Sequence, residues 1–146
     1  MKRILVPLDL ATEPDAVTRV AADAARGGGA TVRLLHVAPV SEAVVDSTGR
    51  TIAYAVQECE RLEAEALDYL RSLEIAFDDV PVEAVVRFGD PAAEILREAD
   101  DFGADLIVLT TAHAIGHRCF GGTATRVWRH ADAAVILLKP PALIAA

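Results

Sequence analysis

The chain has 146 residues, of which 53% are hydrophobic and 25% charged, a composition typical of one ordinary globular domain. Its 14 basic and 22 acidic residues give a formal net charge of −8, which argues against a nucleic-acid backbone or an anionic membrane surface as the main partner. No apolar run approaches the ~20 residues that a membrane-spanning helix needs.

Cysteine usage and the first residues both favour a cytoplasmic protein. The two cysteines, Cys59 and Cys119, cannot form a disulfide framework. Lys2 and Arg3 are followed by too few residues before Asp9 to make a signal peptide. We therefore expect one cytoplasmic domain over residues 1–146, with a short tail at 139–146.

Short apolar runs alternate with helical patterns along the chain. Five runs are too short for helices and suit buried strands: residues 4–8, 31–37, 82–86, 105–110 and 135–138. Apolar residues recur at helical spacing between them, and the last stripe predicts a buried face of Ala124, Val127, Trp128 and Ala131. The long helix at about 51–73 has a stripe that includes Val56 and Cys59.

Particular residues mark where helices begin and end. Thr12, with a carboxylate three residues later at Asp15, predicts a hydroxyl-capped start. The glycines at 27–29 predict the end of the same helix. Asp90 and Pro91 predict another start, because aspartate accepts from unpaired helix amides and proline suits the first helical position.

Strands joined by helices of this length imply a parallel sheet with right-handed crossovers. We expect a single-domain α/β fold with an open, parallel, five-stranded sheet of order 3-2-1-4-5 and two helices on each face. Ligands of such folds bind beyond the carboxyl ends of the strands, where the winding direction reverses. A site is therefore expected among residues 8–12, 37–39, 88–91 and 110–123.

Five pieces of sequence in these regions resemble the universal stress protein family. They are ILVPLD (4–9), LHV (35–37), GDPA (89–92), GADLIV (103–108), and RV (126–127) with RHA (129–131). The resemblance covers essentially the whole chain. It implies an α/β fold of the nucleotide α-hydrolase type, commonly dimeric, that acts in stress responses. Some members of the family bind ATP and others do not.

The family's ATP-binding loop has the pattern glycine, two residues, glycine, nine residues, then glycine followed by serine or threonine. Glycines let backbone amides close on phosphate oxygens, and the last pair opens a helix whose N-terminus favours anions. Counted from His113, the leading glycine positions fall on Thr111 and Ala114, and the last pair is Gly122 and Thr123. The gap is then seven residues instead of nine. If the family pattern is instead aligned on Arg126 and Val127, its serine or threonine position falls on Gly122, and the loop is three residues shorter than the family's.

Two interpretations of this loop stay open. In one, its glycines make a tight turn and Thr123 is a helix N-cap. In the other, Gly116, Gly121, Gly122 and Thr123 form a degenerate nucleotide site, in which Arg118 and Arg126 neutralise phosphate. A Cβ at position 111 or 114 would crowd the phosphate approach, so we expect ATP, with Mg²⁺, to bind weakly or not at all.

Two further residues are candidates for ligand contact. Asp9 ends the first strand at the switch point, where the family's aspartate lies beside the nucleotide; the alternative is a carboxylate that accepts backbone amides of the turn. Val37 and Ala38 would flank an adenine ring. Asp90 is interpreted as a helix cap, Pro7 as a terminator of strand pairing and His36 as a hydrogen-bonded strand residue.

Other chemistry has weaker support. His113, His117 and Cys119 have spacing that a metal site or a nucleophile could use, but we interpret the histidines as exposed loop residues. The sequence predicts no catalytic residue and no metal site.

The leading functional hypothesis is a stress-response regulatory or sensor domain with a degenerate adenine-nucleotide site. One alternative is an ATP-binding, hydrolysing or nucleotide-switched protein that uses Asp9 and residues 116–123. Another is a dimeric adaptor with a vestigial cleft. In each case we expect a homodimer through the apolar edge strand from Val135 to Leu138, with residues 142–144 of the tail at the interface.

Overall fold

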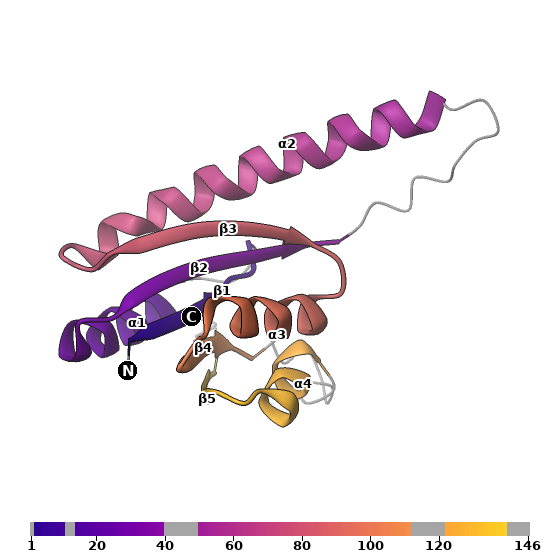
Figure 1. Ribbon diagram of the computed structural model, residues 1–146. Helices are drawn as coiled ribbons and strands as arrows, with labels where there is room; N and C mark the ends of the chain where they lie inside the picture. The colour runs from indigo at the N-terminus through magenta and orange to yellow at the C-terminus, as the bar shows by residue number, and fades with distance from the viewer. Residues whose placement is uncertain (1, 11–13, 40–49, 112–121, 140–146) are drawn as a thin grey trace, which may run out of the picture.

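The computed structural model describes residues 2–10, 14–39, 50–111 and 122–139. Within them, five strands form one sheet in the order β3-β2-β1-β4-β5, and every neighbouring pair is parallel (Figure 1). The strands are β1 (Arg3–Pro7), β2 (Thr31–Ala38), β3 (Val82–Phe88), β4 (Leu106–Thr110) and β5 (Ala134–Leu138). The predicted strand order and the parallel arrangement are confirmed.

The helices follow the strands as the alternation predicts. They are α1 (Asp15–Gly28), α2 (Arg50–Leu73), α3 (Pro91–Phe102) and α4 (Thr123–His130), with a short 3₁₀ turn, η1 (Glu74–Phe77), after α2. Among the described residues, no helix has the length and apolar character to cross a lipid bilayer.

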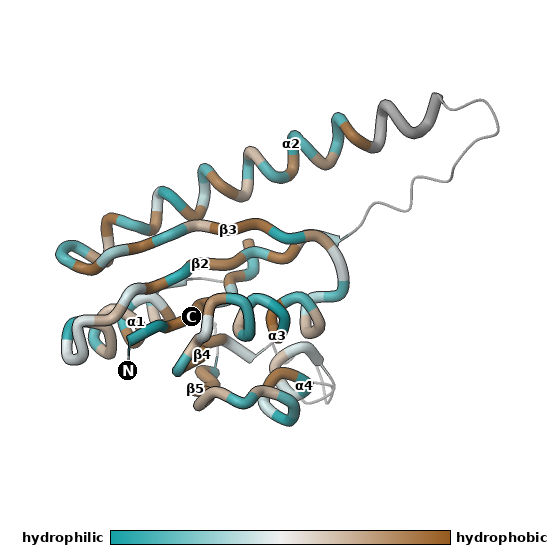
Figure 2. Tube along the Cα trace, in the orientation of Figure 1, coloured by the Kyte–Doolittle hydropathy of each residue, from teal (hydrophilic) through white to brown (hydrophobic). Residues whose placement is uncertain are grey.

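Each face of the sheet buries its own hydrophobic core. Ile4 and Val6 of β1 pack with the apolar side of α1 and the C-terminal half of α2, whereas Leu5 packs on the opposite face against α3 and α4. This alternation is the period-2 pattern of a strand that is buried on both faces. Figure 2 shows the strongly hydrophobic residues concentrated in the strands, while the helices mix hydrophobic and hydrophilic residues. Two helices on each face are confirmed.

Two of the predicted helix ends agree with the structure, at Gly29 and at Asp90. Gly29 ends α1 with a left-handed backbone (φ 65°), and Asp90 caps α3 by accepting from the N–H of Ala93 at 3.1 Å. The first helix, however, begins at Asp15 with Pro14 in the cap position. The predicted start, with Thr12 as the cap, is therefore two residues too early. Proline is tolerated at the start of a helix because the N–H that it lacks would have no partner within the helix. Thr12 itself lies outside the described residues.

Helix α2 is longer than the strand beside it. It has 24 residues, whereas β3 has 7, and Figure 1 shows its first turns extending beyond the sheet. Ala66 and Leu70 are fully buried, but Cys59 is half-buried and Val56 is 52% exposed. The predicted stripe is therefore buried only along the part of the helix that faces the sheet.

Helix α4 buries a narrower face than its sequence predicts. Ala124 and Val127 are buried one turn apart, whereas Trp128 is 60% exposed. The prediction that Trp128 belongs to the core was wrong. A residue adjacent to Val127 is rotated by about 100° around the helix axis, which turns it away from a face this narrow.

Candidate functional site

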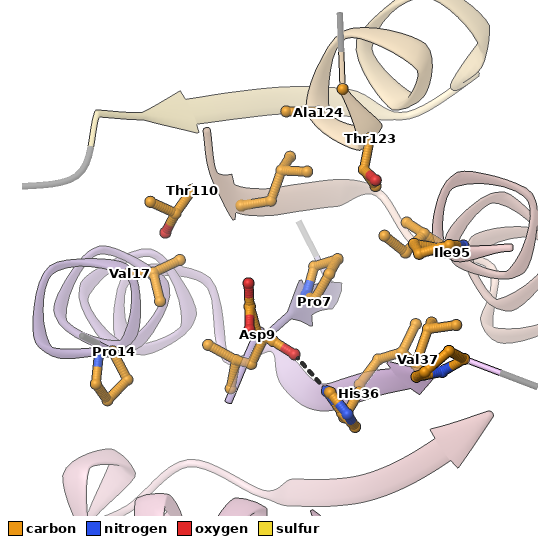
Figure 3. Close-up of a pocket in the computed structure, with 16 residues that line it drawn as sticks. Pro7, Asp9, Pro14, Val17, His36, Val37, Ile95, Thr110, Thr123 and Ala124 are labelled. Carbon is orange, nitrogen blue, oxygen red and sulfur yellow. Dashed lines mark hydrogen bonds between the residues drawn. The ribbon is translucent and has the colours of Figure 1, made fainter. Parts of the chain in front are cut away.

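A cleft of about 440 Å³ lies at the carboxyl ends of the strands, where the chain winds away from β1 in both directions. Figure 3 shows side chains from β1, β2, β4 and the first turns of α1, α3 and α4 around it. The residues that line it are Pro7, Leu8, Asp9, Pro14, Val17, Leu35, His36, Val37, Pro39, Pro91, Ile95, Leu109, Thr110, Gly122, Thr123 and Ala124. The cleft is therefore at the switch point that the topology predicts.

Pro7 helps to explain why the sheet opens there. Consecutive strand residues direct their N–H groups to opposite sides, and the N–H of Leu8 donates to the carbonyl of Leu35 on β2 at 2.7 Å. Residue 7 must then face β4, but proline has no N–H to donate. The β1–β4 pairing ends at Leu5 and Ile107, two residues before Pro7. The interpretation of Pro7 as a terminator of pairing agrees with this geometry.

Four of the residues singled out from sequence meet around the cleft. Asp9 follows β1 and is exposed, Val37 lies near the end of β2, and Gly122 and Thr123 open α4. They are far apart in the chain, and the parallel order of the sheet brings them together. Ala114 and Gly121, also singled out from sequence, lie outside the described residues.

Thr111 lies elsewhere, although the sequence singles it out. Its N–H and its hydroxyl both donate to the carbonyl of Leu138 on β5, at 2.8 and 3.3 Å. The side chain at this end of β4 that lines the cleft belongs to Thr110. Sequence analysis includes Thr110 in the segment 110–123 where a site is expected, but does not single it out, because its only signal is its position as the last residue of a buried strand.

His36 secures the chain where β1 leaves the sheet. Its Nδ1 lies 2.9 Å from the carbonyl oxygen of Leu8 (Figure 3). A carbonyl oxygen only accepts, so Nδ1 is the donor of this hydrogen bond. The bond fixes the backbone immediately before Asp9, which also lines the cleft. Sequence reasoning predicted a hydrogen-bonded histidine here but not its place in the site.

Arg126 and Asp90 join the first turns of α4 and α3. Two guanidinium nitrogens lie 3.0 and 2.9 Å from the two carboxylate oxygens. The Arg126 guanidinium, together with the Ala93 N–H, holds the pKa of the Asp90 carboxyl below its ordinary value. The cap role predicted for Asp90 is confirmed. Arg126, which one of the two interpretations of the loop places near a phosphate, is paired with this carboxylate.

The first turn of α4 differs from the tight-turn interpretation. Gly122 occupies the cap position, no side chain caps the helix, and Thr123 is the first helical residue. Thr123 is therefore not the N-cap, and it lines the cleft with Gly122. A cap at Thr123 would make Ala124 the first helical residue, whereas the helix already begins at Thr123.

No set of three or more metal-ligating side chains occurs in the part of the chain that the structure describes. His113, His117 and Cys119 all fall outside that part.

Comparison with known proteins gives one consistent result. The sequence model described as "Universal stress protein family" matches residues 1–139. Universal stress protein G of Shigella flexneri is 30% identical over 143 residues, which cover 94% of this chain and 99% of that protein.

Solved structures with this fold include relatives from bacteria and archaea. Universal stress protein UspA from Lactobacillus plantarum is similar with a TM-score of 0.78 and 24% identity, over 94% of this chain and 97% of the other. The universal stress protein from Archaeoglobus fulgidus in complex with dAMP has a TM-score of 0.62 and 25% identity, over 95% of this chain and 98% of the other.

Proposed function

Because the chain belongs to the universal stress protein family, we propose that it is a cytoplasmic regulatory or sensor domain of a stress response. Its cleft binds the adenosine part of an adenine nucleotide and holds the phosphates of ATP weakly or not at all. The domain performs no obligatory catalytic step.

The cleft is the single observation that carries this proposal. Its volume of about 440 Å³ lies within the range of small-molecule sites, which combine apolar walls with a few polar groups. Apolar side chains such as Val37, Ile95 and Leu109 line it beside Asp9 and Thr123. The relative from Archaeoglobus fulgidus that was solved with dAMP has the same fold, which supports an adenine ligand for this cleft.

Three features support weak phosphate binding. Arg126, the described arginine of the first turn of α4, is paired with Asp90. Thr111 is bonded to Leu138 across the β4–β5 edge. The sequence also has alanine, with its Cβ, at position 114 instead of the family's glycine.

Calorimetry with adenosine, AMP and Mg-ATP tests the proposal. We expect adenosine and AMP to bind and Mg-ATP to bind no more tightly than AMP. A dissociation constant for Mg-ATP below roughly 10 μM, equivalent to about −7 kcal/mol, would contradict weak phosphate binding. Absence of adenosine binding would contradict the assignment of the cleft. Turnover of ATP by the purified protein would favour the nucleotide-hydrolase alternative.

A matched pair of variants localises the ligand. Thr123→Val removes a hydroxyl that lines the cleft, and we expect it to weaken adenosine binding by about threefold to tenfold. Thr125→Val removes the same group from the same helix, at a residue that does not line the cleft, and should leave binding unchanged.

We also propose a homodimer through β5. This strand is at an open edge of the described sheet, and its Leu137 is 38% exposed. An apolar edge strand is a site that proteins normally protect or pair. The tail residues 142–144, expected at the same interface, lie outside the described residues.

A further inference from the structure

One ion pair connects two parts of the cleft's rim. Pro91 begins α3 and Thr123 begins α4, and both line the cleft. Asp90 immediately precedes the first, and Arg126 lies one turn after the second. The two guanidinium nitrogens of Arg126 face the two carboxylate oxygens of Asp90 at 3.0 and 2.9 Å.

The carboxylate of Asp90 occupies donors of the kind that also bind phosphate groups. The planar guanidinium edge that matches a carboxylate also matches two phosphate oxygens, so one edge binds one of them at a time. Asp90 also accepts the N–H of Ala93 in the first turn of α3. Asp90 immediately precedes Pro91, which lines the cleft, and Asp9 lines it as well, so both carboxylates oppose the approach of a phosphate.

We propose that Asp90 is a specificity-determining residue of the cleft, which discriminates against phosphate-bearing adenine ligands by occupying Arg126 and Ala93. This inference rests on the proposed function of the cleft and adds the group that sets the preference between nucleoside and nucleotide. The side chains of Arg126 and Asp90 are 54% and 49% exposed. An exposed pair is weak by itself, so removal of Asp90 should release Arg126 without unfolding the domain.

The test compares adenosine with AMP on variants of the full chain. Asp90→Ser removes the charge and keeps an N-cap side chain, since serine caps helices about as well as aspartate. We expect Asp90→Ser to strengthen AMP binding by about fivefold to tenfold relative to adenosine, and the gain should shrink at high salt. The double variant Asp90→Ser with Arg126→Gln should lose most of that gain.

Asp101→Ser is the matched control. It removes the same charge from the other end of α3, where the side chain is 69% exposed and faces Arg87 at 3.4 Å. The ratio of AMP to adenosine affinity should not change. Asp90→Asn, which also retains a capping group, provides a second test if the serine variant unfolds more easily.

Each result decides between distinct claims. An AMP-to-adenosine ratio that is the same in the wild type and Asp90→Ser overturns the inference while the proposed function stands. An equal gain with and without Arg126 also overturns it. Failure of adenosine to bind the wild type and every variant overturns the proposed function itself, and the role of Asp90 with it.

Discussion

The guanidinium of Arg33 on β2 lies over the ring of Phe102 at the end of α3, with its central carbon 4.1 Å from the ring centroid. The same guanidinium donates to Glu98 at 2.7 Å, and Glu98 also accepts from Arg87 on β3. Glu98 is only 4% exposed. One buried carboxylate therefore connects two strands to the helix that covers them, and its charge is tolerated because both partners are cations.

We expect Glu98→Gln to lower the free energy of unfolding by about 2 kcal/mol. Breaking a fully buried pair costs more, but Arg33 and Arg87 keep 22% and 27% of their side chains exposed, so water partly compensates them. Urea unfolding at neutral pH measures the change. Glu83→Gln, which removes the half-exposed partner of Arg33, should lower the free energy of unfolding by less than about 1 kcal/mol. Equal costs for the two variants would show that burial of Glu98 does not matter.

Gly89 is the second position where a small change should have a large effect. Its φ is 144°, and an added Cβ would lie 3.0 Å from Oε1 and 3.1 Å from Cγ of Glu94. Gly89→Ala should destabilise the domain by about 1–3 kcal/mol, because it adds backbone strain to a contact with a nearly buried side chain. Gly27→Ala meets nothing within 4 Å and lies in α1, so it should be neutral or stabilising by up to about 1 kcal/mol. Thermal or urea unfolding of both variants measures the two changes in stability, and equal changes would contradict the special role of Gly89.

Asp105 should contribute to the acid sensitivity of the fold. It accepts the N–H groups of Lys2 and Arg3 at 2.8 and 3.0 Å, and these bonds hold the pKa of its carboxyl below the ordinary value. A lowered folded-state pKa means that the contribution is complete above the unfolded pKa, about 4, and is lost as the pH falls through the folded value.

The wild type and Asp105→Asn should therefore differ in stability by a constant amount at pH 5 and above. The difference should shrink below about pH 4, where the unfolded chain takes up the proton first. Urea midpoints at several pH values measure this dependence. A difference that grows on acidification would contradict the assigned sign.

Leu137→Lys tests the proposed homodimer. A lysine on an exposed edge strand opposes pairing with another strand, so we expect a monomer at micromolar concentration where the wild type is a dimer. Light scattering measures the mass. Trp128→Lys removes a more exposed apolar side chain, 60% against 38%, from α4 instead of β5 and should leave the dimer intact. A monomeric wild type would remove the proposal.

The fold was predictable because the local pattern of apolar residues indicates which segments are buried. A run such as residues 106–110 is apolar on both faces, which specifies a central parallel strand without knowledge of its neighbours. Helix faces were less predictable. The exposure of Val56 depends on how far the sheet extends beneath α2, and the exposure of Trp128 depends on how narrow the buried face of α4 is. Neither quantity appears in helical spacing.

The candidate site was predictable where topology alone positions a residue. Asp9 and Val37 lie at strand ends, and all carboxyl ends of a parallel sheet meet at one edge. Contacts that depend on side-chain pairing were not predictable. Asp90 and Arg126 are 36 positions apart, and no local sequence pattern indicates that their side chains form an ion pair.

Pro7 has a consequence for the hydrogen-bonding character of the cleft floor. In a strand, the N–H and the carbonyl of a residue point to the same side, so the backbone polar groups of position 7 face β4. Any other residue there would present an amide that needs an acceptor. Proline at this lining position thus removes one backbone N–H from the floor of the cleft, so a phosphate oxygen finds one donor fewer there.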